Sequence, residues 1–302
     1  MKWLMLCREP RLYSCERLKM AAEKLGHQLD ILDPNRFLLG LEQGRFHSYY
    51  QFGEKFDKSC SNVHKLPDYD GIIPRFGTAS TEIGCQVLHH FELQGVPVLN
   101  NAHSFRLARN KWQSLQCLAA AGIPVPNTVI AGELVNSLNR VSPFSYPIII
   151  KTLSGSQGVG VMLSENQSNA ISLLDTLNVA KINTLTQQFV LEAKGQDIRA
   201  FVIGNRVVAT MQRQGTEGEF RANIHQGGSA KNIILTDAEQ QLAVKATQAL
   251  GLDVAGVDLI RSENGLLVLE VNASPGLEMI EKVSGEPIAE QMIDYLMLKR
   301  ST

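Results

Sequence analysis

The 302-residue sequence contains few cysteines, and they follow no recognisable pattern. There are five, an odd number, with no CxxC spacing and no accompanying histidine cluster. A disulfide framework or a zinc site would need paired or closely spaced ligands, so we expect neither. We expect reduced thiols of a cytoplasmic protein, two of them packed in the core and none catalytic. The five are Cys7, Cys15, Cys60, Cys85 and Cys117, and the two expected in the core are Cys7 and Cys117.

The sequence also lacks long apolar runs and an excess of charge of either sign. No apolar run approaches the roughly 20 residues of a membrane span, so we expect no membrane partner. The formal net charge is −1, which argues against nucleic acid as a direct partner. The opening MKWLMLC has too short an apolar core for a signal peptide, and we expect it to be a first strand. We find no internal repeat and no low-complexity tract.

Alternating strand and helix patterns predict an α/β fold, and 302 residues suffice for two or three domains. A strand at 2–7, an amphipathic helix at 11–25 and a strand at 27–32 predict a right-handed crossover in a parallel sheet. The first hundred residues should form one small domain, with a hairpin insertion at 45–56. We expect further strands at 71–73, 96–99, 127–131, 147–151, 159–163, 184–191, 197–203 and 206–211, and helices at 80–94, 103–121, 132–140, 166–179, 237–250 and 287–299.

The stretch from 257 to 276 pairs two apolar segments around Asn264–Gly265, which is a favoured pair for a tight hairpin turn. Glu270 and Asn272 lie two apart on the second strand and therefore share a face. Asp258, on the first strand, can reach that face if the register allows. Oxygen ligands of this kind suit Mg²⁺ or Mn²⁺. The alternative is that these are ordinary strand-end carboxylates and a turn residue.

A second chemistry-bearing stretch is KTLSGSQGVGV, which begins at Lys151 after a strand of isoleucines. A lysine in that position needs an anionic partner, and glycines allow backbone N–H groups to approach an anion closely. The stretch lacks the GKS or GKT of a Walker A loop, and it joins two strands, so we interpret it as a lid over phosphates. A plain glycine-rich hairpin is the alternative. The residues expected to contact the phosphates are Lys151, Ser154, Gly155, Ser156, Gly158 and Gly160.

The polar segment 212–231 is predicted to be a long loop, and loops of this length are usually functional. Within it, Arg221 and Asn223 could stabilise charge on a transferring phosphoryl group, although a solvated surface arginine is the alternative. Lys111, on the helix before the IPVP connector, could equally lie on a solvated face. Taken together, these stretches predict one site for phosphoryl transfer from a nucleoside triphosphate, with metal ions bridging the phosphates.

The residues quoted above resemble the ATP-grasp carboxylate–amine ligases, and within them the RimK group. The supporting stretches are LYSCERLKMAAEKLGH, IIPRFGTA, ARNKWQSLQCLAAAGIPVP, GQDIRAFVIGNRVVA, VAGVDLI, EGEFRANIHQGG and EVNASPGLEMIEKVSG. The resemblance implies an α/β (α+β) ATP-grasp fold with a Rossmann-like pre-ATP-grasp domain at 1–102. It implies a linker helix and small lid domain at 103–188, and a large sheet domain with the metal site at 189–302.

The resemblance also implies roles for individual residues. Lys151 and Arg221 would be catalytic, and Asp197 would lie near the ribose. The chain has Gln188–Phe189 where the family often has glutamate before an aromatic residue, which would replace a carboxylate contact to adenine with an amide contact. Two Mg²⁺ or Mn²⁺ ions would be held by Asp258, Glu270 and Asn272. ATP would be bound by Lys111, Lys151, Ser154, Gly155, Ser156, Gln157, Gly158, Gln188, Phe189, Asp197, Arg221, Ala222 and Asn223.

The implied reaction forms an acylphosphate and ADP from a carboxylate and ATP, after which an amine displaces phosphate to give an amide. In the group's ribosomal protein S6 ligase the carboxylate is a protein C-terminus and the amine is L-glutamate. Arg75 and the segment 213–221 are candidates for a basic groove that takes such a tail. The alternatives are a small-molecule amino-acid or γ-glutamyl ligase, and a regulatory protein that binds ATP without turnover. A homo-oligomer is also expected.

Overall fold

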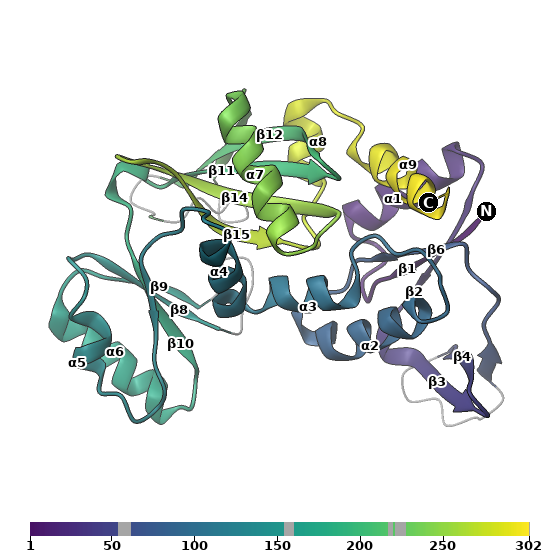
Figure 1. Cartoon of the computed structure of the whole chain (residues 1–302), viewed down its shortest axis with the longest axis horizontal. Coiled ribbons are helices and arrows are strands. Elements are labelled where there is room, and N and C mark those ends of the chain that lie inside the picture. Colours follow the sequence, from purple (N-terminus) through teal and green to yellow (C-terminus); the bar gives the residue numbers. More distant parts are fainter. Residues whose placement is uncertain (54–61, 154–159, 217–219, 221–227, 302) are drawn as a thin grey trace.

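The computed structural model describes the chain except for residues 54–61, 154–159, 217–219, 221–227 and 302. The strands of the described residues form four sheets. In Figure 1 the helices α3 (Ala102–Arg109) and α4 (Lys111–Ala120) lie between the N-terminal part on the right and the part on the left that contains α5 and α6. No helix in the described part of the chain is long and apolar enough to cross a membrane. Short 3₁₀ turns lie at Pro34–Arg36, Thr78–Ser80 and Leu191–Ala193.

The N-terminal sheet has the strand order β2-β1-β6 and is parallel. Its elements are β1 (Lys2–Leu6), α1 (Tyr13–Lys24), β2 (Gln28–Leu32), β6 (Gly71–Pro74) and α2 (Thr81–Glu92). The predicted parallel crossover is therefore confirmed. The strand predicted at 96–99 is wrong, because this segment contributes only an isolated bridge between Val98 and Ile72.

A separate small sheet is formed by β3 (Phe37–Glu42), β4 (Arg45–Gln51) and β5 (Val63–Lys65). The hairpin between β3 and β4 turns at Gln43–Gly44, where both residues have positive φ. The predicted insertion is thus a hairpin, but it starts earlier than 45, and residues 54–56 of the prediction lie outside the described residues.

The predicted single helix at 103–121 is wrong, because two helices occupy this range: α3 (Ala102–Arg109) and α4 (Lys111–Ala120). Asn110 between them has an extended backbone, and its side chain accepts a hydrogen bond from the Gln113 amide. This is an N-cap, which begins a new helix instead of continuing the old one. Arg109 and Lys111 consequently stand on either side of the break. Cys117 on α4 is only half-buried, contrary to expectation, whereas Cys7 is buried.

The third sheet has the order β7-β10-β8-β9. Its strands are β7 (Thr128–Ile130), β8 (Ile148–Thr152), β9 (Val161–Ser164) and β10 (Thr184–Gln188), and α5 (Ser137–Val141) and α6 (Gln167–Val179) accompany it. A small core of Val141, Ile148, Ile150, Ala170 and Leu174 joins sheet and helices. The strand predicted to run to 191 ends at Gln188, and the helix predicted at 132–140 begins only at Ser137.

The fourth sheet is antiparallel with the order β13-β12-β11-β14-β15. Its strands are β11 (Gln196–Ile203), β12 (Arg206–Gln214), β13 (Ser229–Asn232), β14 (Val254–Ser262) and β15 (Gly265–Asn272). Three helices belong to the same part of the chain and are labelled in Figure 1: α7 (Asp237–Ala249), α8 (Glu278–Ser284) and α9 (Ile288–Ser301). The predicted loop 212–231 is corrected at both ends, since β12 runs into it and β13 begins within it. The sequence analysis missed α8.

The two faces of this fourth sheet pack against different partners. Along β11, Ala200 and Val202 belong to the core that includes α7, whereas Phe201 and Ile203 belong to the core shared with α1, α8 and α9. Because side chains alternate along a strand, Arg199 lies on the second face. That face therefore looks towards the N-terminal sheet and the C-terminal helices.

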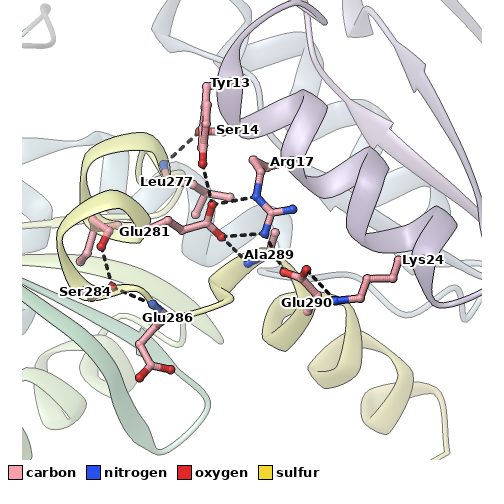
Figure 2. Close-up of polar contacts among 11 residues, drawn as sticks. Tyr13, Ser14, Arg17, Lys24, Leu277, Glu281, Ser284, Glu286, Ala289 and Glu290 are labelled. Carbon is pink, nitrogen blue, oxygen red and sulfur yellow. Dashed lines mark hydrogen bonds and ion pairs between the residues drawn. The ribbon is translucent and has the colours of Figure 1, made fainter.

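An ion-pair cluster fastens α1 to α8 and α9, as Figure 2 shows. Arg17 donates from Nε to Glu281 Oε2 at 2.9 Å and from Nη2 to Glu290 Oε2 at 2.7 Å. The Tyr13 hydroxyl and the Ala289 amide also donate to Glu281. The Glu281 carboxylate is thus buried with all its partners supplied by neighbouring helices.

A polar hub at Asn100 makes a second connection between the N-terminal part and the fourth sheet. Its side chain accepts from the amides of Asp253 and Val254 and donates to the carbonyls of Val254 and Ala273. Asn100 is buried and has a φ of 73°, a conformation that asparagine tolerates better than most residues. The hub therefore fixes the start of β14 and the segment that follows β15.

We expect Arg17→Ala to lower the free energy of unfolding by about 2 to 3 kcal/mol, because it leaves the buried Glu281 carboxylate without its cation. Lys19→Ala on the same helix is the control, since Lys19 and Glu23 are both exposed and 3.9 Å apart, and such pairs contribute less than about 1 kcal/mol. Urea unfolding of both variants measures the difference. Equal losses would contradict a stabilising role for the Arg17 cluster.

Candidate active site

The register of β14 and β15 brings the predicted metal ligands together. Asp258 lies directly opposite Glu270, and Gly256 lies opposite Asn272. Directly opposed residues share a face of the sheet, so the predicted common face is observed. The Asn272 Nδ2 atom donates to Asp258 Oδ2 at 3.4 Å and to the Gly256 carbonyl. The absence of a side chain at Gly256 matters, because a Cβ there would lie 2.7 Å from Pro275 Cβ.

Asp258 is held by two arginines from the neighbouring strands. Arg199 on β11 donates to both carboxylate oxygens at 2.7 Å. Arg213 on β12 lies 3.0 Å from Asp258 Oδ2 and donates to both oxygens of Asp197 at 2.6 Å. Two carboxylates and two guanidinium groups thus form a row across three strands, in which the formal charges cancel.

The pKa values of the two carboxyl groups reflect burial and these arginines. Burial raises the pKa of Asp258, but the charges of Arg199 and Arg213 outweigh it, so the net shift is downward. Burial raises the pKa of Asp197 to about 6, against the opposing influence of Arg213. Asp258 is therefore a carboxylate whose charge is kept only by nearby cations.

Three further cations lie near enough to Glu270 for its charge to affect their pKa values. Lys151 on β8 donates to Gln187 Oε1 at 2.6 Å, and Lys111 donates to the Leu153 carbonyl at 3.3 Å. Burial lowers the pKa of Lys151, of Lys111 and of Arg109, and in each case the Glu270 carboxylate is the strongest influence in the opposite direction. The charge of Glu270 on β15 therefore affects cations of β8, α3 and α4.

The remaining predicted residues divide into two groups. Gln188, at the end of β10, is exposed and Phe189 is half-buried. The Phe189 ring meets that of Phe220 edge-on, with the ring centroids 6.3 Å apart. The second group lies outside the described residues: Ser154, Gly155, Ser156, Gln157, Gly158, Arg221, Ala222 and Asn223. Gly160, at the end of the lid segment, has a φ of 79°, and a Cβ there would lie 2.1 Å from Thr152 Oγ1.

The residues present fit a hard divalent cation. Among the described residues no group of three or more His, Cys, Asp or Glu is arranged to hold a metal ion. The candidate set has only two carboxylates, with the Asn272 carboxamide as the third oxygen donor, and Mg²⁺ is typically held by one or two carboxylates together with substrate phosphates. Both Asp258 oxygens already accept from Arg199, so a metal ion would share this carboxylate with the arginine.

Arg109 and Arg199 were not predicted as site residues, and Arg213 was predicted to lie in a loop. A signal for Arg199 was available, because Asp197 and Arg199 lie two apart in an otherwise apolar strand and must share a face. Arg213 lies directly opposite Asp197 in the β11–β12 register, which no local pattern reveals. Arg109 reaches the site only because the helix breaks after it.

Comparisons with known proteins agree along the whole chain. The RimK PreATP-grasp domain model matches residues 1–105, and the RimK-like ATP-grasp domain model matches residues 108–296. A probable alpha-L-glutamate ligase of Mannheimia succiniciproducens is 58% identical over 299 residues, covering 99% of both chains. Its counterpart from Haemophilus ducreyi is 58% identical over 301 residues, covering 98% of this chain and 99% of the relative.

Solved structures share the fold at lower identity. A RimK domain ATP-grasp protein of Sphaerobacter thermophilus has a TM-score of 0.71 at 22% identity, covering 98% of this chain and all of that one. The D-alanine–D-alanine ligase of Bacillus anthracis, complexed with ATP, has a TM-score of 0.70 at 16% identity, covering 99% and 97%. These similarities support the ATP-grasp fold with its N-terminal pre-ATP-grasp part.

We expect Asp258→Asn to lower the free energy of unfolding by about 3 kcal/mol or more, because two guanidinium groups would lose their shared carboxylate. Glu270→Gln should change it by less than about 1 kcal/mol, since Glu270 is exposed. The two residues face each other across one strand pair, which makes them matched controls. Urea unfolding in the presence of a chelator measures both. A larger loss for Glu270→Gln would contradict the assignment of the arginines to Asp258.

Proposed function

The chain belongs to the RimK-like ATP-grasp family of carboxylate–amine ligases, and we propose that it adds L-glutamate to the C-terminal carboxyl group of a peptide or protein, with formation of ADP. The relatives named probable alpha-L-glutamate ligase, which match the chain from end to end, support glutamate as the amine. The tail of ribosomal protein S6 is the acceptor that we favour.

One observation carries the proposal: cations from three separate elements converge on a pair of opposed carboxylates. Lys151 and Lys111 would hold the phosphates of ATP, since half-buried ammonium groups need anions. Asp258, Glu270 and Asn272 would hold Mg²⁺ or Mn²⁺, which would offset the negative charge of the phosphates. A protein that bound only a neutral ligand would have no use for this excess of positive charge.

The reaction would proceed in two displacements. An oxygen of the acceptor carboxylate attacks the γ-phosphorus, the bond to the β-phosphate oxygen breaks, and ADP leaves. The glutamate nitrogen then attacks the acyl carbon, the carbon–oxygen bond to the phosphoryl group breaks, and phosphate leaves as the amine proton passes to solvent. Lys151 and Arg221 would stabilise the negative charge that develops, and the segment 152–158 would exclude water.

The other expectations form part of the same proposal. Residues 1–102 would be the pre-ATP-grasp domain, 103–188 the linker helix and lid, and 189–302 the metal-binding domain, a division supported by the separate sheets. Gln188, Phe189 and Asp197 would bind the nucleoside, with Ala222 and Asn223 on its phosphate side. A cytoplasmic, homo-oligomeric enzyme is the form in which we expect this reaction.

Turnover with defined substrates tests the function. With ATP, Mg²⁺, L-glutamate and a peptide that carries the S6 C-terminal sequence, we expect ADP and a peptide heavier by glutamyl residues, detected by mass spectrometry. Glu270→Ala should abolish both products while the protein stays folded, because Glu270 is exposed. ADP released with free amino acids alone would favour the small-molecule ligase. No ADP with any acceptor would favour the nucleotide-binding regulator.

We expect Lys151→Ala to weaken ATP binding about tenfold or more, because a charge-assisted contact with the phosphates is lost. Lys245→Ala is the control, because Lys245 is exposed on α7 and the substitution removes the same charge at a distance from the site. Titration calorimetry with ATP and Mg²⁺ compares the two. An unchanged dissociation constant for Lys151→Ala would contradict the assignment of Lys151 to the phosphates.

A further inference from the structure

Two arginines at the edge of the site have no carboxylate partner among the described residues. Arg75 follows β6 and donates from Nη1 to the Pro275 carbonyl at 2.7 Å. Arg109 ends α3 and donates from Nη2 to the Phe76 carbonyl at 3.0 Å. The Nε atoms of both side chains are buried and have no hydrogen-bond partner in the described part of the chain. Each guanidinium group therefore has unused donors.

This situation differs from that of the other arginines in the interior. Arg17, Arg199 and Arg213 each contact two carboxylates or share one. Burial lowers the pKa of Arg75 and of Arg109, which expresses the cost of a charge removed from water without a counter-ion. Arg140 also lacks a carboxylate, but it lies on α5 and donates to both oxygens of Thr184 on β10.

The pair stands where two parts of the site meet. Arg75 comes directly after the carboxyl end of the parallel strand β6, and ligands of open α/β sheets bind beyond such ends. Its partner Pro275 comes three residues after Asn272. Arg109 precedes Lys111 by two residues, and the charge of Glu270 raises its pKa. The two guanidinium groups therefore lie between the N-terminal sheet and the candidate phosphate and metal contacts.

The charge balance leaves the arginines available. The charge of Glu270 raises the pKa of Arg109, of Lys111 and of Lys151. The charge of Arg109 lowers the pKa of Arg75. The phosphates of ATP would occupy the lysines, which act as point charges. The planar guanidinium fork matches the two oxygens of a carboxylate better than an ammonium group does. A second, carboxylate-bearing substrate is thus the fitting partner for the arginines.

We propose that Arg75 and Arg109 bind the two non-reacting carboxylates of the dicarboxylic amino acid whose amine attacks the acylphosphate. This inference rests on the proposed function and names the subsite for its amine substrate. L-Glutamate carries two carboxylates that take no part in the amide bond, one for each guanidinium group of the pair. The reacting terminal carboxylate of the acceptor is consumed in the amide bond and so cannot be a lasting partner of the arginines.

The test compares Arg75→Lys, Arg75→Gln, Arg109→Lys and Arg109→Gln in the full-length protein. We expect the KM for L-glutamate to rise about tenfold or more in the glutamine variants, and less in the lysine variants, which keep the charge but lose the fork. The KM for the peptide and the dissociation constant for ATP with Mg²⁺ should stay within about twofold of wild type. Any wild-type preference for L-glutamate over L-glutamine should shrink in the glutamine variants, because the side-chain carboxylate of glutamate then has no cation to face.

Arg106→Lys is the matched control, since Arg106 lies on α3 with Arg109 but is exposed and pairs with Glu82. Melting temperatures show which variants remain folded, and the lysine variants keep the test open if a glutamine variant does not fold. An unchanged KM for L-glutamate in folded variants of both arginines overturns the inference. A change confined to ATP affinity or to the peptide KM also overturns it, because the pair would then serve the nucleotide or the acceptor.

Direct binding separates this inference from the proposed function. Titration calorimetry measures L-glutamate binding to wild type and to the lysine variants in the presence of ADP and Mg²⁺. If wild type binds L-glutamate, the variants bind it more weakly and no acceptor is modified, the subsite stands and the proposed ligase reaction fails. If wild type turns over but the variants bind L-glutamate equally well, the reaction stands and the subsite fails. If wild type binds no L-glutamate, the subsite fails.

Discussion

The arrangement of this molecule depends on one electrostatic constraint, which is that a charge removed from water must meet an opposite charge. Asp258 is a buried carboxylate in the middle of the fourth sheet, and an isolated charge there would be costly. Strands β11 and β12 supply Arg199 and Arg213 at the required register, and Asp197 balances the second arginine. The sheet order therefore places both arginines on the strands that follow β14 on its side away from β15.

The same constraint explains why the N-terminal part belongs to the site. The segment after Asn272 is fixed from three directions: Asn100 binds the Ala273 carbonyl, Arg75 binds the Pro275 carbonyl, and Ser14 accepts from the Leu277 amide. All three residues precede the fourth sheet in the chain. A segment adjoining the candidate metal ligands thus takes its position from the N-terminal sheet, so the two parts cannot shift relative to each other without disturbing the site.

The sequence predicts the elements that local chemistry decides. The period of two on β15 predicts the common face of Glu270 and Asn272, and the register agrees. The predicted hairpin is also present, but Ser262 pairs with Gly265, so its turn is Glu263–Asn264 and not Asn264–Gly265. The helix break at Asn110 was missed, because the apolar pattern continues through it while a single side-chain cap begins the second helix. The pairing of Arg213 with Asp197 depends on the register of two strands, which no spacing within one strand contains. The lid glycines and Arg221 lie outside the described residues and stay predictions.

The two kinds of cation in the site answer different chemical demands. Burial lowers the pKa of Lys151 and of Lys111. An anion beside either ammonium group would raise its pKa again, because a negative charge stabilises the protonated form. An arginine remains charged in the same surroundings, because its ordinary pKa lies far above that of lysine. Lysines therefore suit an anion that arrives and leaves with its own counter-ion, such as a metal-bound triphosphate. Arginines suit a spectator carboxylate that must be recognised by shape. This difference explains why Lys111 and Lys151 would bind ATP whereas Arg75 and Arg109 would bind L-glutamate. The two substrates would then occupy neighbouring parts of one positively charged site.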